Sequence, residues 1–169
     1  YKANDLNGKT ALISTAASIL DSKGIILCNS AGNSGSDNWK FIGVPADASD
    51  ILSVAAVDFR GNRASFSSFG RKENKYAPNI AVMGKDVAVV SGNNGFKPAD
   101  GTSFSSPLLC GMTACLMQAF PNSSPKEIRE AIIQSANRYK NPDLEYGYGI
   151  PDFALAYFIL SEKTGKKIE

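Results

Sequence analysis

The sequence of 169 residues contains no histidine, and this absence limits the catalysis that the chain can perform by itself. Histidine is the side chain that most often serves as a general base near neutral pH. No apolar run approaches the roughly 20 residues that span a bilayer, so we expect no transmembrane segment. The 18 basic and 16 acidic residues give a net charge of +2, which argues against a nucleic-acid partner.

Cysteine is scarce, and the three residues present are Cys28, Cys110 and Cys115. An odd number excludes a framework in which every cysteine is paired within the chain. Cys110 and Cys115 are five positions apart in a helical pattern, so they should point to different faces. We interpret all three as small buried hydrophobic side chains.

The remaining composition is that of a globular protein, with 43% hydrophobic and 20% charged residues. A chain of this length fits one domain with a sizeable core. Residues 1–5 (YKAND) show neither an initiator methionine nor a signal-peptide pattern, and we interpret them as the cut end of a longer chain.

Short apolar runs alternate with helical patterns along the chain. Helical spacing predicts helices over residues 10–22, which Gly24 would end, over 106–120, from a capping box at 124–127 to about 135, and from 151 to about 162. Pro107 fits the second of these only in its first turn. Apolar runs predict strands over 25–29, 51–57, 80–83 and 87–90. This alternation predicts an α/β domain with a mostly parallel sheet.

Ser103 stands at the mouth of a predicted helix, within residues 100–121 (DGTSFSSPLLCGMTACLMQAFP). The helix dipole places partial positive charge where an oxyanion would form, so Ser103 is a candidate nucleophile. The alternative is that Gly-Thr-Ser only turns the chain and caps the helix, the commoner role of a lone Gly-x-Ser. The G-x-S-x-G elbow is not matched, because position 105 is serine.

Asn33 follows the predicted strand at 25–29, at the end of the sheet where α/β proteins place their sites. Its side-chain amide could donate a hydrogen bond to an oxyanion. The segment around it could equally be a simple turn. A phosphate-binding loop, as in a nucleotide-binding α/β domain using Gly32 to Gly35, is disfavoured because neither the G-x-G-x-x-G nor the P-loop spacing is present.

Together these residues resemble the subtilisin-like serine proteases. Residues 101–107 (GTSFSSP) resemble the nucleophile motif of that family, and residues 30–35 (SAGNSG) resemble its oxyanion-hole segment. Further similarities follow in the family's order: 44–46 (VPA), where the family has a cis peptide before proline, 54–58 (VAAVD), 64–70 (ASFSSFG), 77–80 (APNI) and 147–151 (GYGIP).

The resemblance implies a three-layer α/β fold, a mostly parallel sheet flanked by helices, with its N-terminal part missing. Residues 1–169 would then be the C-terminal portion of a single catalytic domain. Leu108 and Cys110 stand where the family often has histidine and alanine. The segment at 70–76 is more charged than the family's corresponding loop, so a calcium ion is possible by resemblance but no metal site can be assigned, and no other cofactor is expected.

The resemblance also implies roles for individual residues in peptide hydrolysis. Ser103 would be the nucleophile, and Asn33 with the Ser103 N–H would hold the oxyanion. Substrate-binding positions would be Ser30, Ala31, Gly32 and Thr102. The substrate would be a protein or peptide, and the family suggests a secreted or cell-envelope location.

The general base is the part of this mechanism that the chain lacks. In the family the order is Asp, His, oxyanion Asn, Ser, so both absent members would precede Tyr1 or lie on a companion chain. We therefore expect this chain alone to be inactive, with apolar surface exposed where its neighbours are missing. Lysine is the alternative base within the chain (Lys97, Lys72, Lys75, Lys85), although surface solvation suits these residues better.

A second hypothesis is a catalytically inert, subtilase-like module that binds peptides without cleaving them. The residues encoded before Tyr1 distinguish the two, because an Asp-Gly and then a His-Gly motif would favour the protease.

Overall fold

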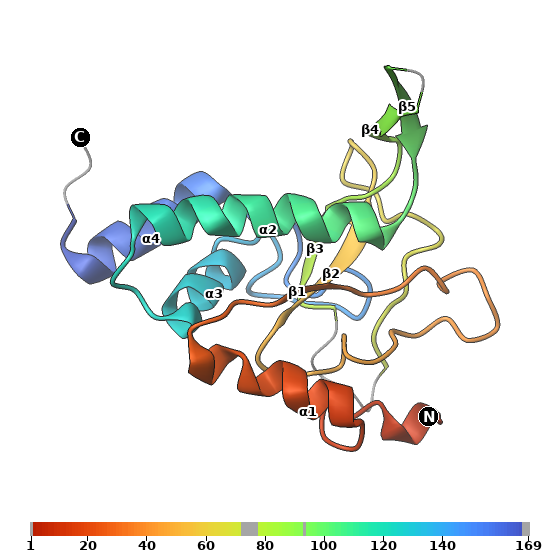
Figure 1. Cartoon of the computed structure of the whole chain (residues 1–169), viewed down its shortest axis with the longest axis horizontal. Helices are drawn as coiled ribbons and strands as arrows, with labels where there is room; N and C mark the ends of the chain where they lie inside the picture. Colours follow the sequence, from red (N-terminus) through yellow and green to blue (C-terminus); the bar gives the residue numbers. More distant parts are fainter. Residues whose placement is uncertain (1, 72–77, 93, 167–169) are drawn as a thin grey trace.

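The computed structural model describes residues 2–71, 78–92 and 94–166. A parallel sheet lies at the centre, with α1 on one side and α2 on the other (Figure 1). The elements in chain order are η1 (Ala3–Asp5), α1 (Leu12–Ile19), η2 (Asp21–Lys23), β1 (Cys28–Ser30), β2 (Leu52–Val57), β3 (Ile80–Met83), β4 (Val87–Ser91), β5 (Gly95–Ala99), α2 (Thr102–Ala119), α3 (Pro125–Gln134) and α4 (Phe153–Thr164). The predicted α/β class with a parallel sheet flanked by helices is confirmed.

The described strands of the parallel sheet have the order β1-β2-β3. Cys28 pairs with Leu52, and Val54 pairs with Ile80. Parallel strands end at the same edge of a sheet, so the loop after β1 opens on the edge where α/β proteins place their sites. Every residue of β2 is buried, as a central strand covered on both faces should be.

The main core lies between this sheet and helices α2, α3 and α4. Leucine, isoleucine and alanine side chains dominate it, and the aromatic pair Phe120–Tyr157 packs edge to face within it. Burial of such aliphatic side chains contributes about 1.5–3 kcal/mol each. Its buried members are Leu52, Val54, Ile80, Leu109, Leu116, Phe120, Ile128, Ala131, Ile132, Ala136, Ala156 and Leu160.

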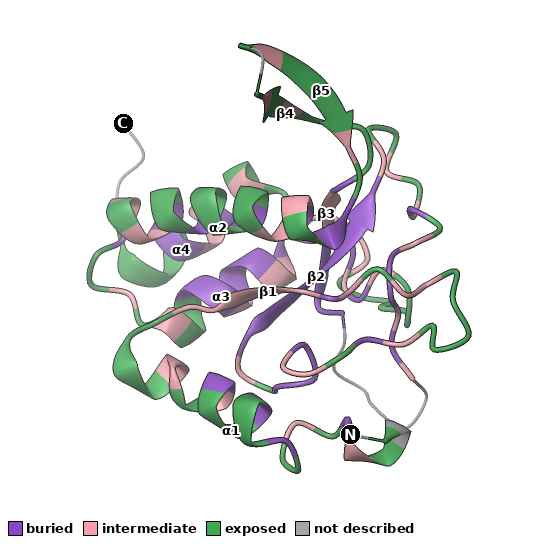
Figure 2. Ribbon diagram, turned by 45° about the vertical axis from the view of Figure 1, so that its right-hand side comes forward, coloured by how far each residue is buried: buried purple, intermediate pink, exposed green. Residues whose placement is uncertain are grey.

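Helix α1 forms where helical spacing predicts it, but its apolar face points away from the core. Leu12 is 80% exposed, and Ile13 and Ile19 are each 51% exposed. The buried side is made by Ser14 and Ala17 instead. Figure 2 shows the same division, with most of α1 coloured as exposed while β2 is buried throughout. The periodicity therefore predicted the helix correctly but not which of its faces the described chain covers.

Strand β1 is also less buried than the sequence predicts. Its three residues are only half-buried, and Ile25 just before it is 49% exposed. Within residues 2–71, 78–92 and 94–166, no strand pairs with the outer edge of β1. The strand is an edge strand of the described sheet, which is why its burial is incomplete.

Helix α2 begins at Thr102, four residues before the predicted start, so Pro107 lies beyond its first turn. Proline has no N–H to donate to the carbonyl of Ser103 four residues earlier. The helix continues through Pro107 because Leu109 and Leu116 are buried against the sheet. Packing has overridden the local preference here.

The segment at 87–99 forms a hairpin rather than a further parallel strand. Strands β4 and β5 pair antiparallel in a sheet of their own, with Val90 opposite Phe96. The hairpin projects from the body of the molecule (Figure 1). Its second strand was not predicted, because Pro98 and the glycines of this segment are unfavourable in strands.

The cysteines also depart from the prediction that all three are buried. Cys110 and Cys115 are exposed and Cys28 is half-buried, and all three are free thiols. Cys110 and Cys115 do point to different faces of α2, where they line separate hollows. The peptide between Val44 and Pro45 is cis, as the resemblance implied.

Candidate active site

Ser103 is the second residue of α2 and is exposed at the N-terminus of this long helix. Gly101 precedes the helix with φ of 154°, a backbone conformation that favours glycine. Its N–H donates to the carbonyl of Gly84 (N–O distance 2.8 Å), which fixes the start of α2 against the end of β3. In the first helical turn the Phe104 N–H donates to the Gly101 carbonyl at 3.0 Å. The Ser103 N–H has no carbonyl four residues earlier within the helix and no acceptor among the described residues, so it is available as a donor beside the Ser103 hydroxyl.

Asn33 lies in the loop after β1, and its side chain is held from the start of α2. The Thr102 backbone N–H and the Thr102 hydroxyl both donate to Asn33 Oδ1, each at 2.9 Å. Two donors on one amide oxygen fix the orientation of the amide. Among the described residues none accepts a hydrogen bond from Asn33 Nδ2, so its hydrogens can be donated outward.

Thr102, a predicted substrate-binding residue, lies between the loop after β1 and the start of α2. Its side chain is fully buried, and the hydroxyl oxygen accepts a hydrogen bond from the Gly32 N–H at 3.2 Å while donating to Asn33. This geometry makes Thr102 a residue that joins the loop after β1 to the helix of Ser103. The sequence reasoning missed this linkage, for which the only signal was the Thr beside the serine in the motif.

The loop that carries Asn33 is held from a second side by Ser68. Ser68 N–H donates to the Gly32 carbonyl at 2.9 Å, and Ser68 Oγ accepts from the Ser34 N–H at 3.0 Å. Gly32 adopts φ of 108°, which its lack of a side chain permits. These contacts fix the backbone on both sides of Asn33.

A hollow of about 550 Å³ lies between β1 and α2 beside the nucleophile candidate. Ser30 and Ser103 both line it, so the structure brings these two predicted site residues together. Its lining is Cys28, Asn29, Ser30, Ser103, Ser106, Pro107, Cys110, Gly111 and Ala114.

Ala31 is buried, and its methyl group packs with Ile42 and Ala46. Any contact of Ala31 with a substrate would therefore use the backbone.

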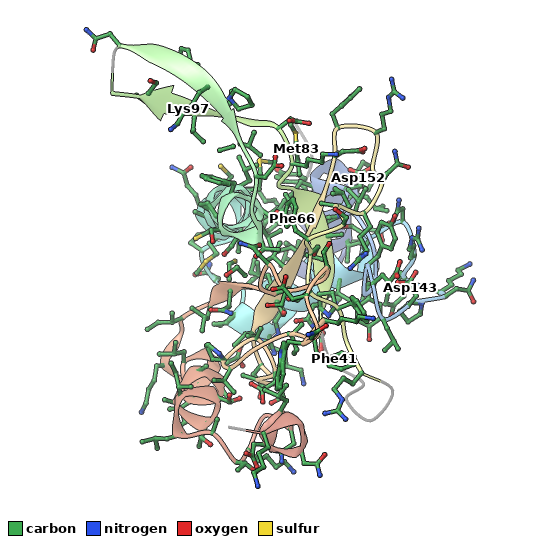
Figure 3. All side chains as sticks on the ribbon, turned by 90° about the vertical axis from the view of Figure 1, so that its right-hand side faces the viewer. Phe41, Phe66, Met83, Lys97, Asp143 and Asp152 are labelled. Atoms are coloured by element: carbon green, nitrogen blue, oxygen red, sulfur yellow. The ribbon has the colours of Figure 1, made fainter. Side chains whose placement is uncertain are left out.

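Two of the four lysines proposed as alternative bases, Lys97 and Lys85, lie in the described part of the chain. Lys97 lies on the projecting hairpin, away from the sheet (Figure 3). Lys85 lies in the turn before β4. Lys72 and Lys75 lie outside the described residues.

Two general features of the described residues bear on metal binding and membrane insertion. Over the described part of the chain, no group of three or more His, Cys, Asp or Glu side chains is arranged to hold a metal ion. In the same residues no helix is both long and apolar enough to cross a membrane.

The sequence profile of the subtilase (peptidase S8) family matches residues 3–149, which is most of the chain. The chain belongs to the subtilase family. It is 32% identical over 141 residues to a thermostable alkaline protease of Halalkalibacterium halodurans, covering 83% of this chain and 37% of the relative. It is also 32% identical over 145 residues to subtilisin DY of Bacillus licheniformis, covering 85% of this chain and 50% of the relative.

Solved subtilase structures share the fold. The patellamide maturation protease PatA superposes with a TM-score of 0.71 at 25% identity, over 88% of this chain and 56% of PatA. The subtilase chain described here thus spans about half the length of the relatives it matches, or less.

Proposed function

We propose that this subtilase chain supplies the nucleophile and the oxyanion donors of a serine endopeptidase. The observation that carries the proposal is the bonding of Asn33. Thr102 holds the Asn33 amide oxygen at the start of α2, which leaves the Nδ2 hydrogens for a substrate oxygen near Ser103. Donors fixed in advance around a developing negative charge are a major source of catalysis in acyl transfer.

The proposed reaction is acyl transfer through Ser103. Ser103 Oγ attacks the carbonyl carbon of the scissile peptide bond while a general base accepts the hydroxyl proton. The carbonyl oxygen becomes an oxyanion that accepts hydrogen bonds from Asn33 Nδ2 and the Ser103 N–H. Collapse of this intermediate breaks the C–N bond, and the base returns the proton to the leaving amine. Water then hydrolyses the acyl-enzyme by the same steps.

We propose that the base is a histidine paired with an aspartate, both outside these 169 residues, either upstream or on a companion chain. The chain has no histidine, and its relatives are about twice as long or longer. The exposed apolar face of α1 and the open edge of β1 offer surface that such a partner would cover. This chain by itself is then inactive.

The proposed substrate is an extended peptide that lies against the strand end at Ser30 to Gly32. Ser30 lines the hollow beside Ser103, and Gly32 is half-buried. Residues 1–169 form part of one catalytic domain in this proposal. The protein acts outside the cytoplasm, secreted or in the cell envelope, without a cofactor. Cell fractionation and activity after exhaustive chelation of metals test these last two points.

A second candidate function is a peptide-binding module without turnover, which the absence of histidine favours. It retains the hollow beside Ser103 but makes no acyl-enzyme. Peptide binding without cleavage by the natural gene product would support the module over the protease.

The role of Asn33 is tested by replacing its donor in the natural gene product. Asn33→Ala and the nearly isosteric Asn33→Asp should both lower kcat about 10²–10³-fold with little change in KM, the loss known for removal of an oxyanion donor in a subtilisin. Steady-state hydrolysis of a peptide substrate measures this. Unchanged kcat in both variants would rule out the role.

A further inference from the structure

Two of the three cysteines, Cys28 of β1 and Cys110 of α2, line the same hollow between the strand and the helix. The Ser106 hydroxyl of α2 donates a hydrogen bond to the Cys28 carbonyl of β1 at 3.0 Å, which joins the helix to the strand. Cys110 lies four residues after Ser106, on the same side of the helix one turn further along. Cys28 and Cys110 are therefore neighbours across the contact of the strand with the helix. Both side chains line the hollow that also contains Ser103.

The two thiols differ in exposure, and this difference determines which of them reacts first. Cys110 is exposed, whereas Cys28 is half-buried beneath the helix. Burial, together with the neighbouring Cys110, raises the pKa of the Cys28 thiol to about 12, so Cys28 gives up its proton less readily than an ordinary thiol. A reagent from solution therefore meets Cys110 first, and Cys28 is placed to react with whatever Cys110 has become.

We propose that Cys28 and Cys110 form a dithiol site that closes to a disulfide. The oxidant is a low-molecular-weight disulfide such as glutathione disulfide. The Cys110 thiolate attacks one of its sulfurs, forming a mixed disulfide and releasing one thiol. Cys28 then loses its proton and attacks the Cys110 sulfur, releasing the second thiol. Two protein thiols are oxidised by two electrons, and one small disulfide is reduced to two thiols.

The cross-link would join the two elements that hold the catalytic groups. β1 leads into the loop of Asn33, and α2 begins at Thr102 with Ser103 next to it. A covalent bond between them would restrain their separation in the unfolded chain and in any partial opening of the site. The inference goes beyond the proposed protease activity and does not depend on it.

Cys115 supplies the matched control on the same helix. It is exposed like Cys110 but lies five residues further on, about 140° around the helix axis. It lines a separate apolar hollow with Met112 and Phe153. It therefore shares the reagent, the helix and the exposure of Cys110 but has no access to Cys28.

The test is oxidation of the natural gene product with glutathione disulfide, followed by tryptic digestion and mass spectrometry. Cys28 lies on the tryptic peptide 24–40, whereas both helix cysteines lie on the peptide 86–126, since trypsin does not cleave before Pro98. The variants Cys110→Ser and Cys115→Ser resolve this ambiguity. We expect the 24–40 peptide cross-linked to 86–126 in the wild type and in Cys115→Ser, but not in Cys110→Ser.

A second readout is thermal unfolding before and after oxidation. The cross-link should raise Tm by about 5–15 °C in Cys115→Ser and leave Tm of Cys110→Ser unchanged. Circular dichroism of the reduced variants checks that both are folded. Glutathione adducts on separate thiols without a cross-link, or a cross-link that survives in Cys110→Ser, would overturn the proposal. Neither readout depends on peptidase activity.

Discussion

The two sides of the sheet differ in how completely their apolar surface is covered. On the side of α2, α3 and α4, the helices close a continuous core over β2 and β3. On the side of α1 and the outer edge of β1, Leu12, Ile13 and Ile19 face outward. Ser103 lies at the start of α2, and Asn33 lies in the loop after β1. The difference shows that the described helices cover one side of the sheet closely, whereas apolar side chains of α1 stay exposed on the other.

The largest expected effect is a difference between two matched isoleucines on helices. Ile132 of α3 is fully buried, whereas Ile13 of α1 is half-exposed. Ile132→Ala should lower the free energy of unfolding of the 169-residue chain by about 2–5 kcal/mol, because it leaves a cavity. Ile13→Ala should cost less than about 1 kcal/mol. Urea denaturation measures both, and equal losses would show that α1 and α3 bury their isoleucines equally.

Substitution of Thr102 tests the hydrogen bonds that join the loop after β1 to the start of α2. Thr102→Val keeps the shape of the side chain but leaves the Gly32 N–H without an acceptor and removes one donor from Asn33. We expect a loss of about 1–3 kcal/mol in unfolding free energy and a lower kcat in the natural gene product. Thr102→Ser retains the hydroxyl and should restore most of both. A valine variant with unchanged kcat would show that Asn33 does not need this support.

The N-terminus of α4 has a side-chain cap, whereas that of α1 does not. Asp152 accepts hydrogen bonds from the N–H groups of Ala154 and Leu155 at the start of α4, whereas Ala11, the N-cap residue of α1, makes no side-chain hydrogen bond to the helix. Asp152→Ala should cost about 0.5–2 kcal/mol. Asp152→Asn, which can also cap, should cost less. Similar losses in both variants, measured by thermal or urea unfolding, would point to a role for the charge instead.

The smallest effect concerns acid stability at the start of α3. Hydrogen bonds from the Ser124 N–H and hydroxyl lower the pKa of Glu127. The folded state thus favours the carboxylate, and the stability this contributes is present above the ordinary glutamate pKa and lost as pH falls through the lowered one. Glu127→Gln should weaken the dependence of Tm on pH in this acidic range. A dependence equal to that of the wild type would contradict the assignment.

The sequence predicted the class of the fold because its local patterns are strong. The GTSFSSP motif, the Ser124 capping box and the apolar run of β2 each determine structure within a few residues. The direction of α1 was not predictable, because helical spacing does not indicate which partner covers the apolar face. The same limit applies to β1, whose incomplete burial depends on the absence of a described neighbour on its outer edge.

The residue types of the candidate site were predictable, but the hydrogen bonds that join them were not. Serine at a helix start and asparagine after a strand were visible in the sequence, whereas the Thr102 bridge joins segments about 70 positions apart. Nothing in a local pattern reports such a contact. The proposed Cys28–Cys110 site likewise joins residues that are far apart in the sequence. The sequence therefore predicted only that both cysteines are buried.

Labelling by a fluorophosphonate probe tests whether the Ser103 hydroxyl is an activated nucleophile. The natural gene product should react at Ser103, as shown by mass spectrometry, and Ser103→Ala should not. The 169-residue chain by itself should stay unlabelled, because no base is present to activate the hydroxyl. A correctly folded natural gene product that fails to label would contradict the account and favour the peptide-binding module.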